Sequence, residues 1–268
     1  MIIVYIFVWL SRCGRSECID DLWISGDAKL LISKIKCSEE AKKEAERLAA
    51  EAILAIDSSF FSTSLHNYTF ITFLNARSLR KHQTDIMNDP ELMKSSFMGI
   101  GETHLNVDEE ILLDGFANAS FVNAGKGKGV AAFTKQSTVN VTKILKETFS
   151  AIVLEFVGIR IIFAYMSNKI NMDEVKNSFG PIMKMKKATI IMGDMNFHFP
   201  NENPMKSYFK DLGFHQVIDR VTHDEGHILD HIYTLGMSIS KENVFLKSLY
   251  FSDHDALCIK FENFHMMI

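Results

Sequence analysis

The stretch ATIIMGDMNFH, residues 188–198, decides the fold class of this chain. It is an apolar run that passes through Gly193 into two polar residues, Asp194 and Asn196. A short apolar run bounded by turn residues predicts a buried β-strand, and its end presents the polar side chains. A single Asp after a strand is ordinarily a turn residue, so this stretch gains meaning only if it recurs.

The same arrangement recurs along the chain. Apolar runs end at Asn75 (FITFLNARSL, 70–79), Glu102 (FMGIGETHL, 97–105), and Tyr165 and Asn168 (IIFAYMSN, 161–168). Asp230 lies inside ILDHIYT (228–234), and Asp253 and His254 come just before the last apolar run (FSDHDALCIKF, 251–261). Turn formation alone does not explain so many strand ends of this chemistry. They predict one functional site, assembled where strands end.

Short apolar runs separated by polar turns, with few helices, predict an α/β (α+β) fold of two packed sheets with helices outside. We expect helices near residues 78–88, 172–185 and 205–212. We expect strands near residues 69–74, 97–101, 130–133, 139–144, 151–156, 159–165, 189–192, 228–234 and 256–261. The strands at 151–156 and 159–165, which only Val157 and Gly158 separate, predict a hairpin.

Metal-assisted phosphoester hydrolysis is the chemistry that needs this set of side chains. Mg²⁺ takes oxygen ligands from one or two carboxylates and keeps waters for a substrate phosphate. Glu102 suits the ligand role, with Asn75 and Asp253 nearby. Asp194 suits activation of the attacking water, and His254 held by Asp230 suits stabilisation of the charged transition state.

Residues 69–264 resemble the endonuclease/exonuclease/phosphatase superfamily, which includes DNase I-like nucleases and inositol polyphosphate phosphatases. The resemblance rests on FLNARSL, GETHL, YMSN, GDMN, ILDHIY and SDHDAL, in the family's order. It implies a four-layer α/β sandwich of two mixed sheets and hydrolysis of phosphate esters with Mg²⁺, or Mn²⁺ as a substitute. By motif it implies metal positions at Asn75, Glu102 and Asp253, phosphate contacts at Tyr165 and Asn168, a water-activating pair at Asp194 and Asn196, and the pair of Asp230 with His254.

Two residues depart from the family pattern. Gly101 stands where the family usually has Gln, and Arg77 stands where abasic-site enzymes have a second acidic residue. NARSL resembles endonucleases of non-LTR retrotransposons and Helitron-like elements more than dedicated repair enzymes. The sequence therefore favours a mobile-element DNA endonuclease over a repair enzyme.

The first part of the chain supports that interpretation. VWLSRCGRSECIDDLWISG (8–26) resembles the last motif of Helitron-type helicases, in which Arg12 would be an arginine finger. No GxxxxGK[ST] motif occurs, so we expect no ATP hydrolysis. We divide the chain into a helicase-like remnant with a helix (1–57), a linker (58–68) and the hydrolase domain (69–268).

Composition limits the function classes. Of 268 residues, 29 are Lys or Arg and 33 are Asp or Glu, a formal net charge of −4 that shows no basic excess for non-specific DNA binding. The four cysteines match no zinc pattern, and the apolar run at residues 1–10 is too short for a membrane span. We expect a monomer without membrane attachment, inside the cell and in the nucleus rather than the cytoplasm.

Three further motifs are candidates for DNA contacts or metal binding. Lys126 and Lys128, in a Gly-rich turn, and Arg77 are candidate contacts to a DNA backbone, with a solvated surface as the alternative. His223, His227 and His231 recur every four residues, but Gly226 and the alternating ILDHIYT predict a loop and a strand instead of a helical zinc face.

A phosphatase for a phosphoinositide or other small phosphoester, and an inactive binding relic, stay open as alternative functions.

Overall fold

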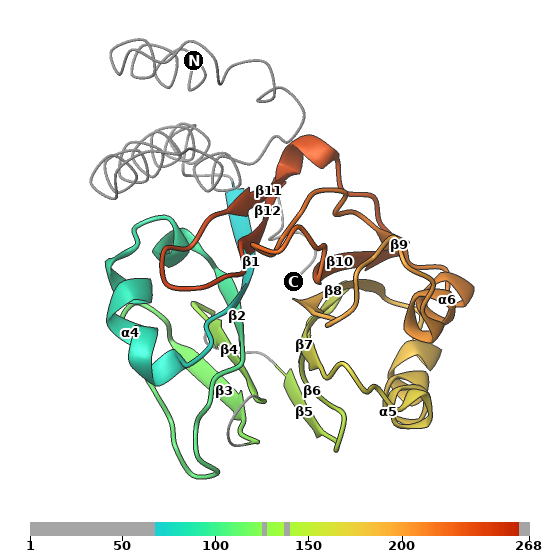
Figure 1. Cartoon of the computed structure of the whole chain (residues 1–268), viewed down its shortest axis with the longest axis horizontal. Coiled ribbons are helices and arrows are strands. Elements are labelled where there is room, and N and C mark those ends of the chain that lie inside the picture. Colours follow the sequence, from blue (N-terminus) through green and yellow to red (C-terminus); the bar gives the residue numbers. More distant parts are fainter. Residues whose placement is uncertain (1–67, 125–127, 137–139, 263–268) are drawn as a thin grey trace. The chain divides into compact units, whose positions relative to one another are not determined.

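The computed structural model describes residues 68–124, 128–136 and 140–262 of the 268-residue chain (Figure 1). The predicted helicase-like remnant, its helix and the linker lie outside the described residues, as does Lys126. No helix of the described part is long and apolar enough to cross a membrane.

Two mixed six-stranded sheets form the fold, as the sequence predicted. The first sheet has the order β11 (Val244–Lys247), β12 (Ala256–Glu262), β1 (Tyr68–Asn75), β2 (Phe97–Gly101), β4 (Val130–Thr134) and β3 (Asn118–Val122). The second has the order β5 (Asn140–Leu145), β6 (Phe149–Glu155), β7 (Ile159–Met166), β8 (Ala188–Asp194), β10 (Asp230–Leu235) and β9 (His215–Gln216). The expected hairpin of β6 and β7 is antiparallel.

Every strand and helix predicted between residues 69 and 261 is present, with small shifts of the ends. The helices are α4 (Leu79–Asn88), α5 (Met172–Lys184) and α6 (Pro204–Asp211), and two 3₁₀ turns cover Leu92–Lys94 and Lys241–Asn243. Side-chain caps fix where α5 and α6 begin, since Asn171 accepts from the Asp173 amide and Asn203 accepts from the Met205 amide. The sequence analysis missed β3, β9 and β11, which are short edge or near-edge strands.

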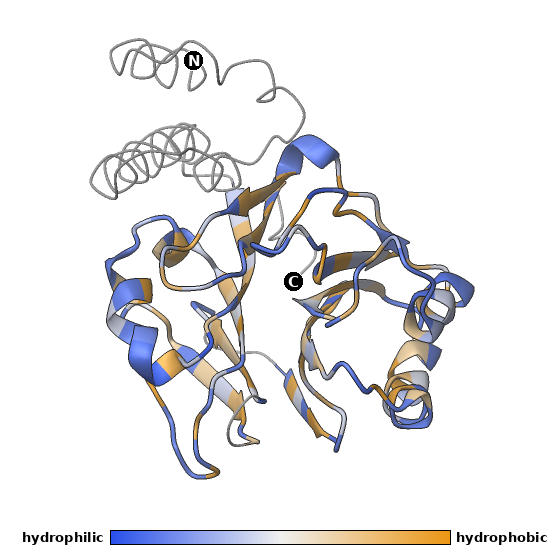
Figure 2. Cartoon of the chain, viewed as in Figure 1, coloured by the Kyte–Doolittle hydropathy of each residue, from blue (hydrophilic) through white to orange (hydrophobic). Residues whose placement is uncertain are grey.

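Successive side chains of β7 point to opposite faces of the second sheet and so join two layers of the fold. Ile161 and Phe163 face the core between the two sheets, while Ile162 and Ala164 face the core under α5 and α6. Both faces of the strand are buried, which explains its continuous apolar run. A third core packs α4 against the outer face of the first sheet. Figure 2 shows hydrophobic residues concentrated on the strands and hydrophilic ones on α4 and the connecting loops.

Glycine allows close approach both between the two sheets, at Gly99, and between β7 and β8 within one sheet, at Gly193. A Cβ atom at Gly99 would lie 2.2 Å from Cδ1 of Phe163, and one at Gly193 would lie 2.0 Å from the Ala164 carbonyl oxygen. Larger residues at these positions would push strands apart, because an interior at native density has no space to absorb them. The packing thus fixes the spacing of the strands whose ends carry the polar residues.

Candidate active site

The polar strand ends converge at one edge of the two sheets. β1 and β2 are parallel, and Asn75 pairs with Gly101, so that Asn75 lies beside the start of the Glu102 loop. β7 and β8 are also parallel, and Tyr165 pairs with Asp194. β10 runs antiparallel to β8 and starts at Asp230, opposite Asp194.

Asp194 is the centre of this group and is almost completely buried. Its Oδ2 accepts a hydrogen bond from Nδ2 of Asn75 at 2.9 Å, which joins the two sheets. Its Oδ1 accepts from the Asn196 amide at 2.9 Å. Burial raises the pKa of Asp194, the nearby Asp230 raises it further, and His254 and the two hydrogen bonds oppose the rise. A carboxylate with a raised pKa is a better proton acceptor than an ordinary Asp, as water activation requires.

Asp230 and His254 form a buried pair. Nδ1 of His254 lies 2.7 Å from Oδ2 of Asp230, whose side chain is 0% exposed. Burial alone would lower the pKa of His254, but the carboxylates of Asp230, Asp194 and Asp253 outweigh it and raise the pKa to about 9. His254 is therefore a positively charged donor at neutral pH, held in one orientation by Asp230.

Ser252 anchors the loop that carries His254, a role that the sequence analysis missed. Its Oγ donates to the Asn75 carbonyl oxygen at 2.7 Å and accepts from the His254 amide at 3.2 Å. Because Asn75 also contacts Asp194, this hydroxyl connects the two halves of the site. A Ser two residues before a predicted catalytic His was visible in SDHDAL as a possible ST turn.

Tyr165 lies between the carboxylates. It is 8% exposed and lies beside the side chains of Glu102 and Asn196. Burial raises its pKa, and the charges of Glu102 and Asp194 add to this effect. Tyr165 thus stays protonated and can donate a hydrogen bond.

Backbone strain accumulates at the same strand ends. Arg77, Glu102, His104 and Asn196 have φ angles of 50°, 46°, 54° and 52°, in the left-handed region that non-glycine residues rarely adopt. Such residues are costly and gather at functional sites. His104 Nε2 lies 3.6 Å from Oε2 of Glu102, so that strain places these two side chains together.

Both departures from the family pattern have a structural counterpart. Arg77 forms an ion pair with Asp253, with Nη1 and Oδ2 2.7 Å apart, and its side chain is 56% exposed. At Gly101, a Cβ atom would lie 2.9 Å from Cζ of Phe73, so the ring of Phe73 fills the space of a side chain there. The edge of the site therefore carries a guanidinium at position 77 and an aromatic ring beside position 101.

The oxygen donors fit a hard divalent cation such as Mg²⁺. Glu102 presents a partly exposed carboxylate, and Oδ1 of Asp253 is buried and has no hydrogen-bond partner among the described residues. The side chain of Asn75, expected from the sequence at the metal site, makes hydrogen bonds to protein groups instead. Its Oδ1 accepts from the Arg77 amide at 3.0 Å and its Nδ2 donates to Asp194, so in this arrangement it orients the base.

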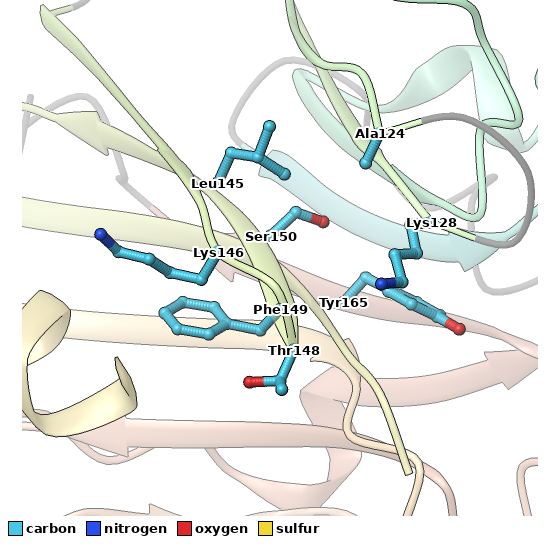
Figure 3. A pocket seen from close by; sticks show the side chains of 8 residues that line it. All are labelled: Ala124, Lys128, Leu145, Lys146, Thr148, Phe149, Ser150 and Tyr165. Atoms are coloured by element: carbon cyan, nitrogen blue, oxygen red, sulfur yellow. The ribbon is translucent and has the colours of Figure 1, made fainter. Parts of the chain in front are cut away.

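The predicted substrate contacts lie around this centre. Asn168 is exposed in the loop after β7. Lys128 donates to the Glu147 carbonyl oxygen at 2.8 Å. A shallow pocket beside the site is lined by Ala124, Lys128, Leu145, Lys146, Thr148, Phe149, Ser150 and Tyr165 (Figure 3). Two lysines thus flank the pocket that reaches Tyr165.

No protein-family model and no curated protein matches the chain. Solved structures do match its fold. An AP endonuclease from Archaeoglobus fulgidus has a TM-score of 0.57 at 16% identity, over 73% of this chain and 99% of that one. The 3′ phosphatase NExo from Neisseria, bound to a product DNA hairpin, has 0.54 at 16%, over 72% and 99%. The endonuclease domain of TRAS1, a telomere-specific non-LTR retrotransposon, has 0.50 at 13%, over 73% and 98%. The chain therefore shares the fold of these three structures, a DNase I-like sandwich of two mixed sheets.

Proposed function

We propose that the chain is a divalent-metal-dependent phosphodiester hydrolase that acts on DNA as an endonuclease. The observation that carries the proposal is the arrangement around Asp194. A buried carboxylate with a raised pKa, held at both oxygens, lies at the same strand edge as a histidine whose pKa is about 9. One group is suited to accept a proton and the other to meet negative charge.

In the proposed reaction, a water attacks the phosphorus in line with the leaving oxygen. Asp194 accepts the proton of that water, while Asn75 and Asn196 hold its carboxylate in one orientation. His254 donates to a phosphate oxygen and offsets the charge that develops there, with Asp230 fixing its ring. Tyr165, which lies beside Glu102, donates a hydrogen bond to the substrate phosphate. Glu102 and Asp253 would hold a Mg²⁺ ion, which would supply Lewis-acid polarisation of the scissile phosphate.

DNA is favoured over a small phosphoester by two considerations. Lys128 and Lys146 both line the pocket beside Tyr165, where they can contact the phosphates of a polymer backbone. The structures that share the fold include a retrotransposon endonuclease, an AP endonuclease and a DNA-bound 3′ phosphatase. The NARSL motif adds the mobile-element origin to the proposal.

Nicking of supercoiled plasmid in Mg²⁺ tests this function. We expect open-circular product with the wild type, none in EDTA, and none with Asp194→Asn. Asp211→Asn changes an exposed acid at the end of α6 and is the matched control, which should keep full activity. Phosphate release from small phosphoesters without nicking would identify the phosphatase instead, and no turnover in either assay would indicate a binding relic.

The organisation of the remaining chain is part of the proposal. We propose that residues 1–57 derive from a helicase and that the protein works in the nucleus. A chain that starts at Ser58 should then fold and keep its nicking activity. Aggregation or inactivity of that shortened chain would mean that the first residues belong to the hydrolase domain.

A further inference from the structure

The loop between β9 and β10 brings two histidines and a glutamate together. Donor atoms of His223, Glu225 and His227 all lie within 4.8 Å of one another. The sequence predicted a loop and strand here instead of a helical zinc face, and residues 223–227 do form a loop. The third histidine of the repeat, His231, does not take part, since it is buried and lies within hydrogen-bond distance of the Tyr233 hydroxyl.

Backbone hydrogen bonds explain why the loop places these side chains together. The His223 amide donates to the His227 carbonyl oxygen at 3.1 Å, and the Gly226 amide donates to the His223 carbonyl oxygen at 2.9 Å. Gly226 has a φ of +81°, which allows the chain to reverse within the loop. The rings of His223 and His227 consequently lie nearly parallel, with centroids 6.5 Å apart.

The hydrogen bonds of His223 leave its Nδ1 unprotonated. Nδ1 accepts from the Glu225 amide at 3.1 Å, so a metal ion that binds at this nitrogen displaces that hydrogen bond. Its Nε2 faces Oδ2 of Asp253 at 3.5 Å. A metal-bound histidine commonly donates its other nitrogen to a carboxylate, which fixes its orientation. Asp253 is placed to do this for His223.

We propose that His223, Glu225 and His227 form a binding site for a transition-metal ion of the Zn²⁺ class, next to the catalytic centre, where the ring centroid of His223 lies 4.6 Å from that of His254. Two imidazoles and one carboxylate are a ligand set that zinc uses with an open fourth position, whereas Mg²⁺ prefers oxygen ligands. Zinc ligands at about 2.0–2.2 Å from a tetrahedral ion lie about 3.4 Å apart, so the donors must close by up to about 1.4 Å. Glu225 and His227 can make this movement, because their side chains are 76% and 46% exposed.

His198 is near the site but does not complete it. Its ring centroid lies 5.2 Å from that of His227. However, its Nδ1 accepts from the Ile228 amide at 2.9 Å, so the neutral ring carries its proton on Nε2. The open position is therefore left to water or to an exogenous ligand.

Titration of the full-length chain with ZnCl₂ in a buffer that contains excess Mg²⁺ tests the proposal by calorimetry. We expect His227→Ala to lose one equivalent of bound Zn²⁺ relative to the wild type, and Glu225→Gln to weaken that equivalent at least tenfold. His215→Ala removes an exposed histidine of β9 and is the matched control, which should bind as the wild type does. Any Zn²⁺ bound at the catalytic carboxylates or elsewhere in the chain is common to all of these proteins and cancels in the comparison.

Co²⁺ gives a second measurement. Its visible absorption reports imidazole ligation directly, and we expect the band of this site to be absent in His227→Ala and present in His215→Ala. Plasmid nicking in Mg²⁺ by His227→Ala shows that the variant is folded. If the wild type does not nick plasmid, circular dichroism shows instead whether the variant is folded. Equal Zn²⁺ stoichiometry and equal Co²⁺ spectra in wild type and His227→Ala would overturn the proposal, whatever the outcome of the nicking assay.

Discussion

Removing His254 should cost far more stability than its partly polar environment suggests, and removing Asp230 at the same time should restore much of the loss. Oδ2 of Asp230 contacts His254 Nδ1 at 2.7 Å, and Oδ1 has no hydrogen-bond partner within the described chain. In His254→Ala, Asp230 becomes a fully buried carboxylate without a partner and opposite Asp194. Breaking a buried ion pair in this way costs about 3–5 kcal/mol.

The double variant removes the charge together with its partner. A buried amide without full hydrogen bonding costs about 1–3 kcal/mol, less than an unpaired charge. We therefore expect Asp230→Asn/His254→Ala to be more stable than His254→Ala alone. Its loss of unfolding free energy should be at least about 2 kcal/mol smaller than the sum of the two single losses. Urea denaturation at pH 7 without divalent metal, followed by circular dichroism, measures all four proteins.

Activity should show the same coupling. His254→Ala should lower plasmid nicking about 10²–10⁴-fold, Asp230→Asn should lower it less, and the double variant should resemble His254→Ala, because residues that act as a unit are not additive. Asp211→Asn is again the control for both measurements. If the stability losses add and the activity losses multiply, Asp230 and His254 act independently and the reasoning is refuted.

Three further predictions concern the metal, the substrate and pH. Glu102→Gln should lower Mg²⁺-dependent nicking about 10²-fold or more, and a near-wild-type rate would place the metal elsewhere. Arg77→Ala should raise KM for plasmid and reduce the salt dependence of binding by about one charge; an unchanged salt slope would show that Arg77 does not contact phosphate. Burial lowers the pKa of His231 to about 4, below its ordinary value of about 6.5. The unfolded chain therefore binds more protons between these values, and stability should fall as pH drops from about 6.5 to 4. His231→Asn should flatten that part of a urea-denaturation pH series, and an unchanged slope would contradict the assignment.

The sequence predicted the strands because most of them are buried on one or both faces, which leaves uninterrupted apolar runs such as that of β7. The strands that it missed are at or near sheet edges. β3 (Asn118–Val122) reads NASFV, with small and polar residues that match no strand pattern, and β9 is only two residues long. Edge positions need fewer apolar residues, so their sequences carry a weaker signal.

The chemistry of the candidate site was predictable, whereas its internal contacts were not. Polar residues at strand ends indicated which side chains could act. The hydrogen bond from Asn75 to Asp194 joins two residues 119 positions apart and depends on how the two sheets pack, so no local pattern encodes it. The pairing of Arg77 with Asp253 and the meeting of His223 with Glu225 and His227 likewise depend on loop geometry.

The pairing of β1 with β12 determines when in synthesis this protein can begin to act. β12 lies between β11 and β1 inside the first sheet, so the first and last described strands are neighbours. A nascent chain that has not yet released residues 256–262 from the ribosome exposes one side of β1 and cannot hold His254 beside Asp230. Long-range pairings of this kind form late, because the intervening chain must first be ordered. The growing polypeptide should therefore be inactive toward its substrate until the last strand is inserted, and chains interrupted before that strand should aggregate through the open edge of β1.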